Sequence, residues 1–561
     1  SGHPFPFSAN NTINAIVRIF QVQPDGTKDY KIAILPIPSV LDRIIEVPSS
    51  SNKVHRFVYL EDVISYYAIQ FFQGYGIEEA MIFRLTRDAD LEIDEEDAKD
   101  LLTEVEASLR RRRRGDAVRL EVVRAGSPEL LRTVLASVEL EEKDVYHLDG
   151  HLDCRMYFDF SNYPGYDNLR YKPFEPKIPS DLIGFEGENL LDVIRNRDIF
   201  VHHPFESFSV VEQFVAQAAV DPNVLAIKQT LYRVSGESPI IASLIKAADN
   251  GKQVTVLMEV KARFDEEHNI TMARRLEKAG CHVIYGLKGL KTHSKITMVV
   301  RREEDGIRRY VHLATGNYNG KTARIYTDCG IFTCNDEYGD DASRFFNLIS
   351  GYSDPPIWNK FIVAPLNLRE RIMDLIDEEI QCAKRGEDAY IIAKMNSLLD
   401  KKVIAKLYEA SANGVRIDLI VRGICTLRPG IAGVSDNITV RSIVGRFLEH
   451  HRLFYFRNGG NEKIFLSSAD WMPRNLNERV ELMIPIEDKR HKARIKGILD
   501  LYLVDTLKAH LMRSDGSYYK VSNIEGPLSA QEELMEAANT QDSREQMTVI
   551  ERFKPMFKMK E

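Results

Sequence analysis

An internal repeat constrains the fold of this 561-residue chain more than any other feature. The stretch IIASLIKAADNGKQVTVLMEV at 240–260 aligns without a gap with VIAKLYEASANGVRIDLIVRG at 403–423, at a constant offset of 163 residues. Each stretch indicates an amphipathic helix followed by an apolar strand. Since the same helix and strand pattern occurs twice at this distance, the chain is expected to contain two tandem copies of one α/β domain.

The order of elements around the first copy predicts a mainly parallel sheet. Apolar strands alternate with amphipathic helices through VLAIKQTLYRV, PIIASLIKAADNG, KQVTVLMEV, a helix near 266–280 and CHVIYG. Such alternation favours parallel strands covered by helices. Three further strand candidates, HSKITMVV, RRYVHLATGN and IYTDCGIFTCN, follow without helices between them.

Three domains are expected, and the fold class is α/β: two tandem α/β domains preceded by an α+β head domain. The head domain covers 1–180 and ends in a proline-rich stretch at 170–181 that is typical of a linker. The two copies occupy 181–360 and 361–561, the second with a polar helical tail beyond about residue 513. Five arginines in the head domain, Arg110 to Arg114, are either a solvated helix end or a patch that collects anions.

Composition narrows the class of protein further. The net charge of −8 and the pI of about 6.0 are not those of a dedicated nucleic-acid binder. No apolar run reaches the roughly 18 residues that cross a bilayer, and the first residues lack the features of a secretory signal, so we expect a cytoplasmic protein without a transmembrane segment. Six cysteines, with Cys329 and Cys334 as the closest pair, lack CxxC spacing and predict reduced, buried thiols rather than disulfides or a zinc site.

Both copies carry a histidine at the head of a predicted strand, with a basic residue two positions later. His293 precedes Lys295, and His450 precedes Arg452. Since side chains two apart in a strand lie on the same face, each pair is expected to point the same way. A small polar turn, ATGNYN or SSADWMPRN, follows each pair. One such histidine would usually be an ordinary solvated residue, but its duplication indicates one active site at the interface of the two copies.

This duplicated H-x-K pattern with a G-x-N-type turn is similar to the phospholipase D superfamily, whose members cleave phosphodiesters through a histidine intermediate. The expected fold is therefore two phospholipase D-like α/β domains. The full motif of that superfamily is H-x-K-x-x-x-x-D, and here its Asp position holds Val300 in the first copy and Arg457 in the second. The departure counts against a lipase or a nuclease.

Seven segments between 231 and 475 resemble those of polyphosphate kinases: LYRVSGESPI, EVKARFDEEHNI, GLKTHSKITMVV, LATGNYNGKTARIYTD, VRGICTLRPG, FLEHHRLFYFRNGG and LSSADWMPRN. HPFPFSAN and FRLTRDADLEIDEED near the start also resemble that family. The resemblance implies reversible transfer of the terminal phosphate of ATP to a growing polyphosphate chain, with the phosphohistidine at His293 and His450 facing it. A family N-terminal helical domain is expected to be absent from this chain.

The same resemblance implies the ligands and the setting of the protein. ATP or ADP and inorganic polyphosphate are the expected partners, with no nucleic acid, and Mg²⁺ is the expected cofactor. A homo-oligomer is expected, in the cytoplasm, with peripheral association with the inner membrane left open. Neither GxxxxGK[ST] nor GxGxxG occurs, so side chains are expected to bind the nucleotide.

Phosphoryl transfer develops negative charge on oxygen, so the site needs positive side chains. The resemblance assigns Tyr326, Arg422 and His450 to nucleotide binding, and Arg233 and Arg263 to a magnesium and phosphate site. Because a guanidinium has no lone pair, those two arginines are expected to clamp magnesium-bound phosphate oxygens rather than to ligate the metal. The further cations expected at the site are Lys295, Arg452 and Arg479.

The acidic cluster Asp265, Glu266 and Glu267 has two interpretations: magnesium ligands, or favourable charge in the first turn of the next helix. Two rival functions also remain, a phosphodiesterase of phospholipase D type and a non-enzymatic scaffold that binds polyphosphate or nucleic acid.

Overall fold

The computed structural model describes residues 7–49, 54–88, 102, 105–106, 115–123, 126–234, 238–262, 265–351, 356–521 and 526–540. Arg110 to Arg114 and Arg263 lie outside the described residues. The chain divides into two compact units, 1–172 and 173–561, and the division falls within the stretch expected to be a linker.

A five-stranded sheet forms the core of the first unit. Ser127 caps the helix that packs on it, since its hydroxyl accepts the amide of Leu130, and Pro128 occupies the first turn. Leu130 and Val134 of this helix pack against the sheet. The sheet has the order β2-β1-β5-β6-β7, and the elements of the unit are β1 (Ile13–Val22), β2 (Lys28–Pro36), β3 (Ile44–Val47), β4 (Arg56–Tyr59), α1 (Leu60–Tyr66), β5 (Gly76–Arg87), β6 (Ala117–Val123), α3 (Pro128–Val138), β7 (Val145–Leu148) and α4 (Met156–Phe160).

The second unit begins with a half that carries His293. Its sheet has the order β11-β10-β9-β13-β14-β15, with β8 on the other side of β15. Its elements are α5 (Leu190–Asn196), β8 (Ile199–His203), α6 (Ser209–Val220), β9 (Val224–Leu231), α7 (Pro239–Asp249), β10 (Gln253–Met258), α8 (Glu266–Lys278), β11 (His282–Ile284), β12 (Lys291–Thr292), β13 (Ile296–Glu303), β14 (Gly306–Ala314), β15 (Tyr326–Thr333) and α9 (Asp336–Ile349).

The half that follows repeats this plan and carries His450. Its sheet has the order β25-β24-β19-β18-β17-β21-β22-β23, with β16 on the other side of β23. The elements are β16 (Ile362–Ala364), α10 (Leu368–Lys384), β17 (Tyr390–Met395), α11 (Lys401–Ala412), β18 (Arg416–Val421), β19 (Ile438–Ile443), β20 (Leu448–Glu449), β21 (Arg452–Phe456), β22 (Lys463–Ser467), α12 (Pro473–Asn477), β23 (Arg479–Ile486), α13 (Lys489–Leu503), β24 (Ala509–Met512), β25 (Tyr518–Lys520) and α14 (Ala530–Thr540).

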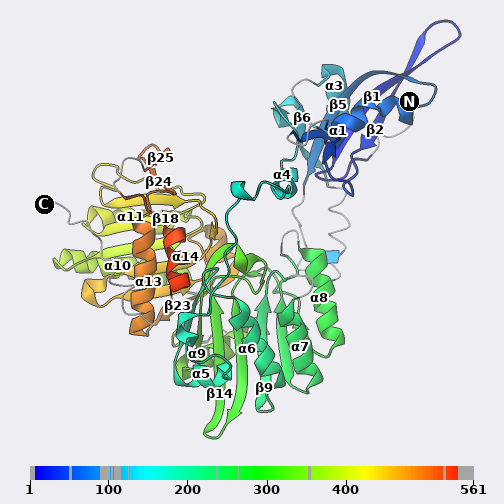
Figure 1. Ribbon diagram of the computed structural model, residues 1–561. Coiled ribbons are helices and arrows are strands. Elements are labelled where there is room, and N and C mark those ends of the chain that lie inside the picture. Colours follow the sequence, from blue (N-terminus) through cyan, green and yellow to red (C-terminus); the bar gives the residue numbers. More distant parts are fainter. Residues whose placement is uncertain are drawn as a thin grey trace. The chain divides into compact units, whose positions relative to one another are not determined.

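The structure confirms the repeat in sequence. Strand β10 begins at Gln253 and β18 at Arg416, which is the offset of 163 residues found in the alignment. The helix before each strand, α7 or α11, packs with its helical neighbour, α6 or α10, on the outside of the sheet (Figure 1). Two tandem α/β halves follow a head domain of strands and helices, so the expected fold class is confirmed.

Each sheet is mixed rather than mainly parallel, and that detail of the prediction is wrong. Strands β9, β10 and β11 are parallel, but β13, β14 and β15 run antiparallel to their neighbours. The cause is the connection: helices cross over between the first three strands, whereas Glu303 pairs with Gly306 in a tight hairpin between β13 and β14. Adjacent strands joined by so short a turn must be antiparallel.

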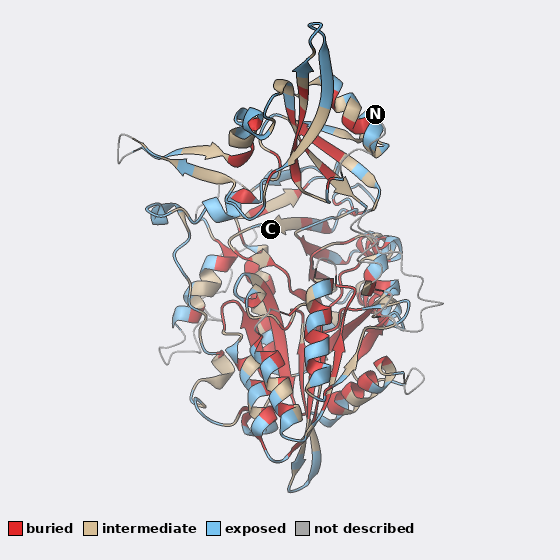
Figure 2. Ribbon diagram, turned by 90° about the vertical axis from the view of Figure 1, so that its right-hand side faces the viewer, coloured by how far each residue is buried: buried red, intermediate tan, exposed pale blue. Residues whose placement is uncertain are grey.

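The two halves of the second unit exchange short strands. Strand β12 belongs to the first half but pairs with β23 of the second. Strand β20 belongs to the second half but pairs with β15 of the first. A buried core is also common to both halves and includes Met298 and Val311 from one sheet and Leu453 and Leu482 from the other. In Figure 2 the strands of this unit are largely buried while its helices keep an exposed face.

Free cysteines follow the sequence prediction with one exception. Cys281, Cys329, Cys334 and Cys382 are buried and Cys425 is partly buried. Cys154 is exposed, so the expectation of buried thiols is wrong for that residue.

Candidate active site

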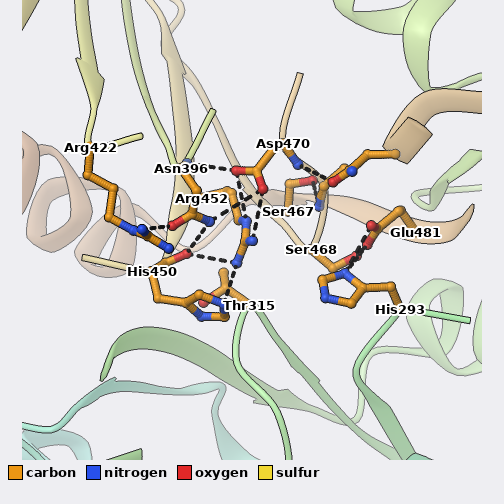
Figure 3. Close-up of polar contacts among 12 residues, drawn as sticks. His293, Thr315, Asn396, Arg422, His450, Arg452, Ser467, Ser468, Asp470 and Glu481 are labelled. Atoms are coloured by element: carbon orange, nitrogen blue, oxygen red, sulfur yellow. Dashed lines mark hydrogen bonds and ion pairs between the residues drawn. The ribbon is translucent and has the colours of Figure 1, made fainter. Parts of the chain in front are cut away.

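His293 lies between β12 and β13, where the chain leaves the sheet of the other half. The main-chain amides of His293 and Ser294 both donate to the carbonyl of Val480 on β23, at 2.9 and 3.0 Å. The ring of His293 is 7% exposed, and its Nδ1 lies 2.9 Å from the carboxylate of Glu481. The backbone of the second half therefore places this histidine, and a carboxylate of that half orients its ring (Figure 3).

His450 has the same environment with the halves interchanged. It follows β20, its amide donates to the hydroxyl of Thr327 on β15 at 3.1 Å, and its Nδ1 lies 2.8 Å from Asp328. Asp328 is the third residue of β15, and Glu481 is the third residue of β23. Each histidine is therefore oriented by a carboxylate from the opposite half, at equivalent positions of the two repeats.

Burial and nearby charge set the protonation of the His293 pair. Burial, followed by the positive charges of Lys295 and Arg479, holds the pKa of His293 well below its usual value of 6.5. Burial raises the pKa of Glu481 from 4.5 to about 7. At neutral pH the imidazole is therefore uncharged, and with Nδ1–H donated to Glu481 its lone pair lies on Nε2.

The carboxylic acid beside His450 differs in its pKa from the one beside His293. Burial lowers the pKa of His450. Burial alone would raise the pKa of Asp328, but His450 and a hydrogen bond from Thr315 hold it below its usual value. Asp328 is thus a carboxylate at neutral pH and can stabilise a proton on His450.

The Nε2 atoms of the two histidine rings have different surroundings. Nη1 of Arg452 lies 3.2 Å from Nε2 of His450. In the described part of the chain, Nε2 of His293 has no hydrogen-bond partner, and the nearest ring is Tyr232, edge-on at 5.0 Å between centroids. His293 therefore keeps an uncommitted nucleophilic nitrogen, whereas the corresponding atom of His450 contacts a guanidinium.

The basic residues two positions after each histidine also differ. Arg452 is held by Asp470, with Nη2 at 3.0 Å from Oδ2, and donates to the carbonyl of His450 at 2.8 Å. Lys295 donates to the carbonyl of His293 and is 2% exposed. Burial holds the pKa of Lys295 well below its usual value, and an anion in the site would favour its charged form.

The three predicted nucleotide-binding residues are Tyr326, Arg422 and His450, and the first two lie beside the third. The rings of Tyr326 and His450 lie 5.2 Å apart between centroids. Nε of Arg422 donates to Oδ1 of Asn396 at 2.7 Å and to the carbonyl of Glu449 at 2.6 Å, next to His450 (Figure 3). The structure thus brings these three residues together.

Two more predicted cations lie on the His293 side. Arg479 begins β23, with Nη1 at 3.7 Å from Oε1 of Glu481. Arg233 follows Tyr232, whose ring contacts His293, and its Nε lies 2.7 Å from Asp265. Arg263, the other predicted phosphate clamp, lies outside the described residues.

The acidic cluster supports the helix interpretation for two of its three members. Glu266 and Glu267 lie in the first turn of α8, where negative charge favours the helix dipole. Asp265 immediately precedes α8 and forms an ion pair with Arg233. Among the described residues, the one trio of His, Cys, Asp or Glu whose ligand atoms converge lies elsewhere, so Asp265 is the one member of this cluster left as a single carboxylate for magnesium held together with substrate phosphates.

The residues at the altered Asp positions have structural roles. Val300 continues β13. Arg457 forms ion pairs with Asp388 and Glu462 at 2.8 and 2.5 Å. Neither position supplies a carboxylate to the site.

Sequence reasoning missed Glu481 and Asp328, the two carboxylates that orient the histidines. A signal was present, because each is the third residue of the strand that follows the small polar turn. The offset between the repeats hides it: 163 residues in the aligned stretch fall to 157 between the histidines (450 against 293) and to 153 between the carboxylates (481 against 328).

Two buried histidines, each oriented by a carboxylate from the opposite half and surrounded by arginine and lysine side chains, form a site of the class that carries out chemistry at phosphorus. Family models match three regions: the polyphosphate kinase middle domain at 1–160, C-terminal domain 1 at 189–355 and C-terminal domain 2 at 361–531. The chain belongs to the polyphosphate kinase family.

Individual relatives support this membership. A polyphosphate kinase of Halalkalibacterium halodurans is 52% identical over 533 residues, which cover 94% of this chain and 75% of the relative. One of Bacillus anthracis is 51% identical, over 93% of this chain and 74% of the relative. The crystal structure of polyphosphate kinase from Porphyromonas gingivalis superposes with a TM-score of 0.84 at 31% identity, covering 97% of this chain and 80% of that one.

The structure also bears on one expectation about membranes. Within the ranges that the structure describes, no helix is both long and apolar enough to cross a bilayer.

Proposed function

We propose that this chain transfers the terminal phosphate of ATP reversibly to inorganic polyphosphate, with Nε2 of His293 as the nucleophile. The observation that carries the assignment to His293 is the difference between the two rings. Nε2 of His293 is uncommitted among the described residues, while Nε2 of His450 contacts Arg452. Membership of the polyphosphate kinase family supports the reaction itself.

In the first step, Nε2 attacks the γ-phosphorus of ATP, a P–N bond forms, and the bond to the bridging oxygen of ADP breaks. Glu481 accepts the hydrogen bond of Nδ1–H, so it holds the required tautomer and stabilises the positive charge that develops on the ring. In the second step, a terminal oxygen of polyphosphate attacks the same phosphorus and the imidazole leaves. Since a phosphohistidine retains most of the transfer potential of ATP, both steps run in either direction.

Positive side chains stabilise the transferred group. Lys295 and Arg479 are close enough to lower the pKa of His293 by their charge, and the same charges attract phosphoryl oxygens. Arg452 also contributes to this field and is held in position by Asp470. Because these groups are buried and preorganised, little reorganisation is needed when charge develops during transfer.

His450 is suited to a proton-transfer role. Its Nδ1 contacts the carboxylate of Asp328, which stabilises the imidazolium form. We assign to His450 contact with the nucleotide phosphates and protonation of the leaving or entering oxygen. Tyr326 beside it offers a ring face to the base, and Arg422 offers N–H donors to the nucleotide phosphates.

Magnesium fits this site as a companion of the nucleotide. Mg²⁺ is usually held by one or two carboxylates together with substrate phosphates. Asp265, 38% exposed in its side chain and paired with Arg233, is the carboxylate that would hold the ion, while Arg233 would contact the phosphate oxygens around it. When bound, the ion neutralises charge on the phosphates.

Labelling with γ-³²P ATP and magnesium tests the proposal. Acid-labile label on the protein, absent from His293→Ala and present in His450→Ala and in the exposed control His282→Ala, is the expected result. If the protein takes up no label but hydrolyses a phosphodiester, the phospholipase D-type alternative is supported instead. Polyphosphate binding without label or turnover would support the scaffold.

The cellular location and oligomeric state of the enzyme are part of the same proposal. We expect a cytoplasmic homo-oligomer, with membrane association limited to the periphery of the inner membrane. Light scattering of the purified chain and fractionation of cells that express it measure both.

A further inference from the structure

A second cluster of reactive side chains lies directly behind the active-site residues. Cys329 follows Asp328 on β15, and since successive side chains of a strand point to opposite faces, it points away from His450. Cys329 is paired with His202 across the β15 and β8 ladder, so these two side chains share a face. His451, the residue after His450, completes the cluster.

The three side chains converge. One ligand atom from each of His202, Cys329 and His451 lies within 4.8 Å of the others. The rings of His202 and His451 are 5.3 Å apart between centroids at an interplanar angle of 77°. All three residues are at most 1% exposed.

The polar atoms of this cluster are not satisfied by the protein. Nε2 of His202 and both ring nitrogens of His451 lack a hydrogen-bond partner of normal geometry among the described residues. Buried polar atoms are usually paired, because desolvation without a partner is unfavourable.

We propose that His202, Cys329 and His451 form a buried zinc site, distinct from the magnesium of the catalytic reaction. Two imidazoles and one thiolate are the ligand types that zinc prefers, and hard ions such as Mg²⁺ prefer oxygen. On binding, one Zn–S and two Zn–N bonds form, and the thiol proton of Cys329 leaves to solvent.

The dimensions are compatible with this ion. Zinc binds sulfur at about 2.3 Å and imidazole nitrogen at about 2.0–2.1 Å, which brings ligand atoms to about 3.3–3.8 Å from one another. The side chains must close by about an ångström from the present 4.8 Å limit. Rotation of the side chains about their χ angles provides such a movement without a change in the strands.

The cluster borders a cavity on its His202 side, and the charges around it are balanced. His202 lines this cavity of about 370 Å³ together with Arg494, Leu501 and Ala538, so this is the side from which an ion can approach. Two cations lie nearby, but each is paired: Lys394 with Glu449 at 2.8 Å, and Arg494 with Glu206 at 2.7 Å. The remaining positive charge is that of the bound ion, which the thiolate offsets in part.

The bound ion would connect three segments of the site. It joins β8, β15 and the residue after His450, so it fixes Asp328 and His450 from behind. Its role is structural, since none of the three ligands faces His293 or its phosphate-binding cations.

The test uses the full chain, purified without a polyhistidine tag. Elemental analysis is expected to find about one equivalent of zinc per chain. A chelator then removes the zinc, and cobalt(II) is added in the presence of excess magnesium. This cobalt is expected to give the near-ultraviolet absorption of a cobalt–thiolate bond. Cys329→Ala should lose both signals, while the matched control Cys334→Ala, also a buried cysteine, should keep them. Zinc-free protein that gives no cobalt–thiolate absorption overturns the proposal, as does full absorption in Cys329→Ala.

A second variant covers failure of Cys329→Ala to fold. His451→Gln keeps the thiol but removes one ligand, and circular dichroism reports whether it folds. Its cobalt affinity should fall at least tenfold, and an unchanged affinity in folded His451→Gln rejects the site. In the parent chain, zinc should raise the unfolding temperature. An unfolding temperature that stays unchanged at saturating zinc also rejects the site.

Discussion

Glu481 orients His293 across the boundary between two repeats, with 2.9 Å between the carboxylate and Nδ1, although 188 residues separate the two in sequence. Asp328 does the same for His450, 122 residues away. Neither half of the α/β unit therefore contains a complete histidine–carboxylate pair. The active site exists because each half supplies the group that orients the histidine of the other.

Removal of the Glu481 carboxylate should slow phosphorylation of His293. Glu481→Ala leaves Nδ1–H without its acceptor, so the reactive tautomer is no longer held. We expect the rate to fall by up to about 10⁴-fold, the loss found when the carboxylate behind the catalytic histidine of a serine protease is replaced. Rapid-quench labelling in a single turnover measures this rate, and a rate within twofold of the parent would refute the role of Glu481.

The pH dependence of His293 phosphorylation should reflect the titration of the Glu481 carboxyl group. Its pKa is raised to about 7 by burial, so the carboxylate that accepts the Nδ1–H bond is lost as pH falls through this value. The rate should therefore rise with pH and level off above about 7. In Glu481→Gln, which cannot titrate, this limb should be absent, and its persistence there would assign the titration to another group.

The same raised pKa predicts a change in stability with pH. The folded protein binds the Glu481 proton more tightly than the unfolded protein, whose carboxyl titrates near 4.5. Between about 4.5 and 7 the folded state thus holds more protons, and the contribution of Glu481 to stability decreases as pH rises. Thermal unfolding of the parent and Glu481→Gln across this window should show the difference narrowing toward the acidic end.

Asp328→Ala should impair turnover more than labelling. Without Asp328, His450 loses the carboxylate that stabilises its proton, and general acid catalysis contributes about 10²-fold or more. Steady-state polyphosphate synthesis should fall by that factor, whereas phosphohistidine on His293 should still accumulate over long times. Complete loss of label in folded Asp328→Ala would contradict the separation of the two roles.

Asp470→Ala should destabilise the second unit. It leaves the guanidinium of Arg452, 4% exposed, without its bidentate partner. Breaking one side of a buried ion pair costs about 3–5 kcal/mol of unfolding free energy. The matched control is Asp388→Ala, which removes the exposed partner of Arg457 and should change stability little. Equal unfolding midpoints for the two variants in urea would contradict this difference.

The sequence predicted the repeat, the two histidines and most of the cations, because these depend on local pattern. Tyr326 and Arg422 lie close to His450, as the family resemblance implies, and their roles stay predictions. The antiparallel half of each sheet was mistaken for part of a parallel one, since periodicity reports burial rather than strand direction. Glu481 and Asp328 were missed because their function depends on strands that cross between the halves, a contact that no local pattern encodes.

The proposed zinc site could not be predicted from the sequence for the same reason. Cysteine spacing along the chain predicts no zinc site, because such spacing reports only on cysteines that are close in sequence. His202, Cys329 and His451 are far apart in sequence and meet because β8 pairs with β15 and β20 brings the second half alongside.

The exchange of β12 and β20 has a consequence for how such a site could specialise. Two identical copies joined by these strands would form a symmetric dimer, in which any substitution appears on both sides at once. Joining the copies in one polypeptide removes that constraint. The pairs Lys295 and Arg452, Arg479 and Tyr326, and Glu481 and Asp328 occupy equivalent positions with different chemistry. In the proposed mechanism, broken symmetry of this kind lets one histidine accept a phosphoryl group while its counterpart transfers a proton.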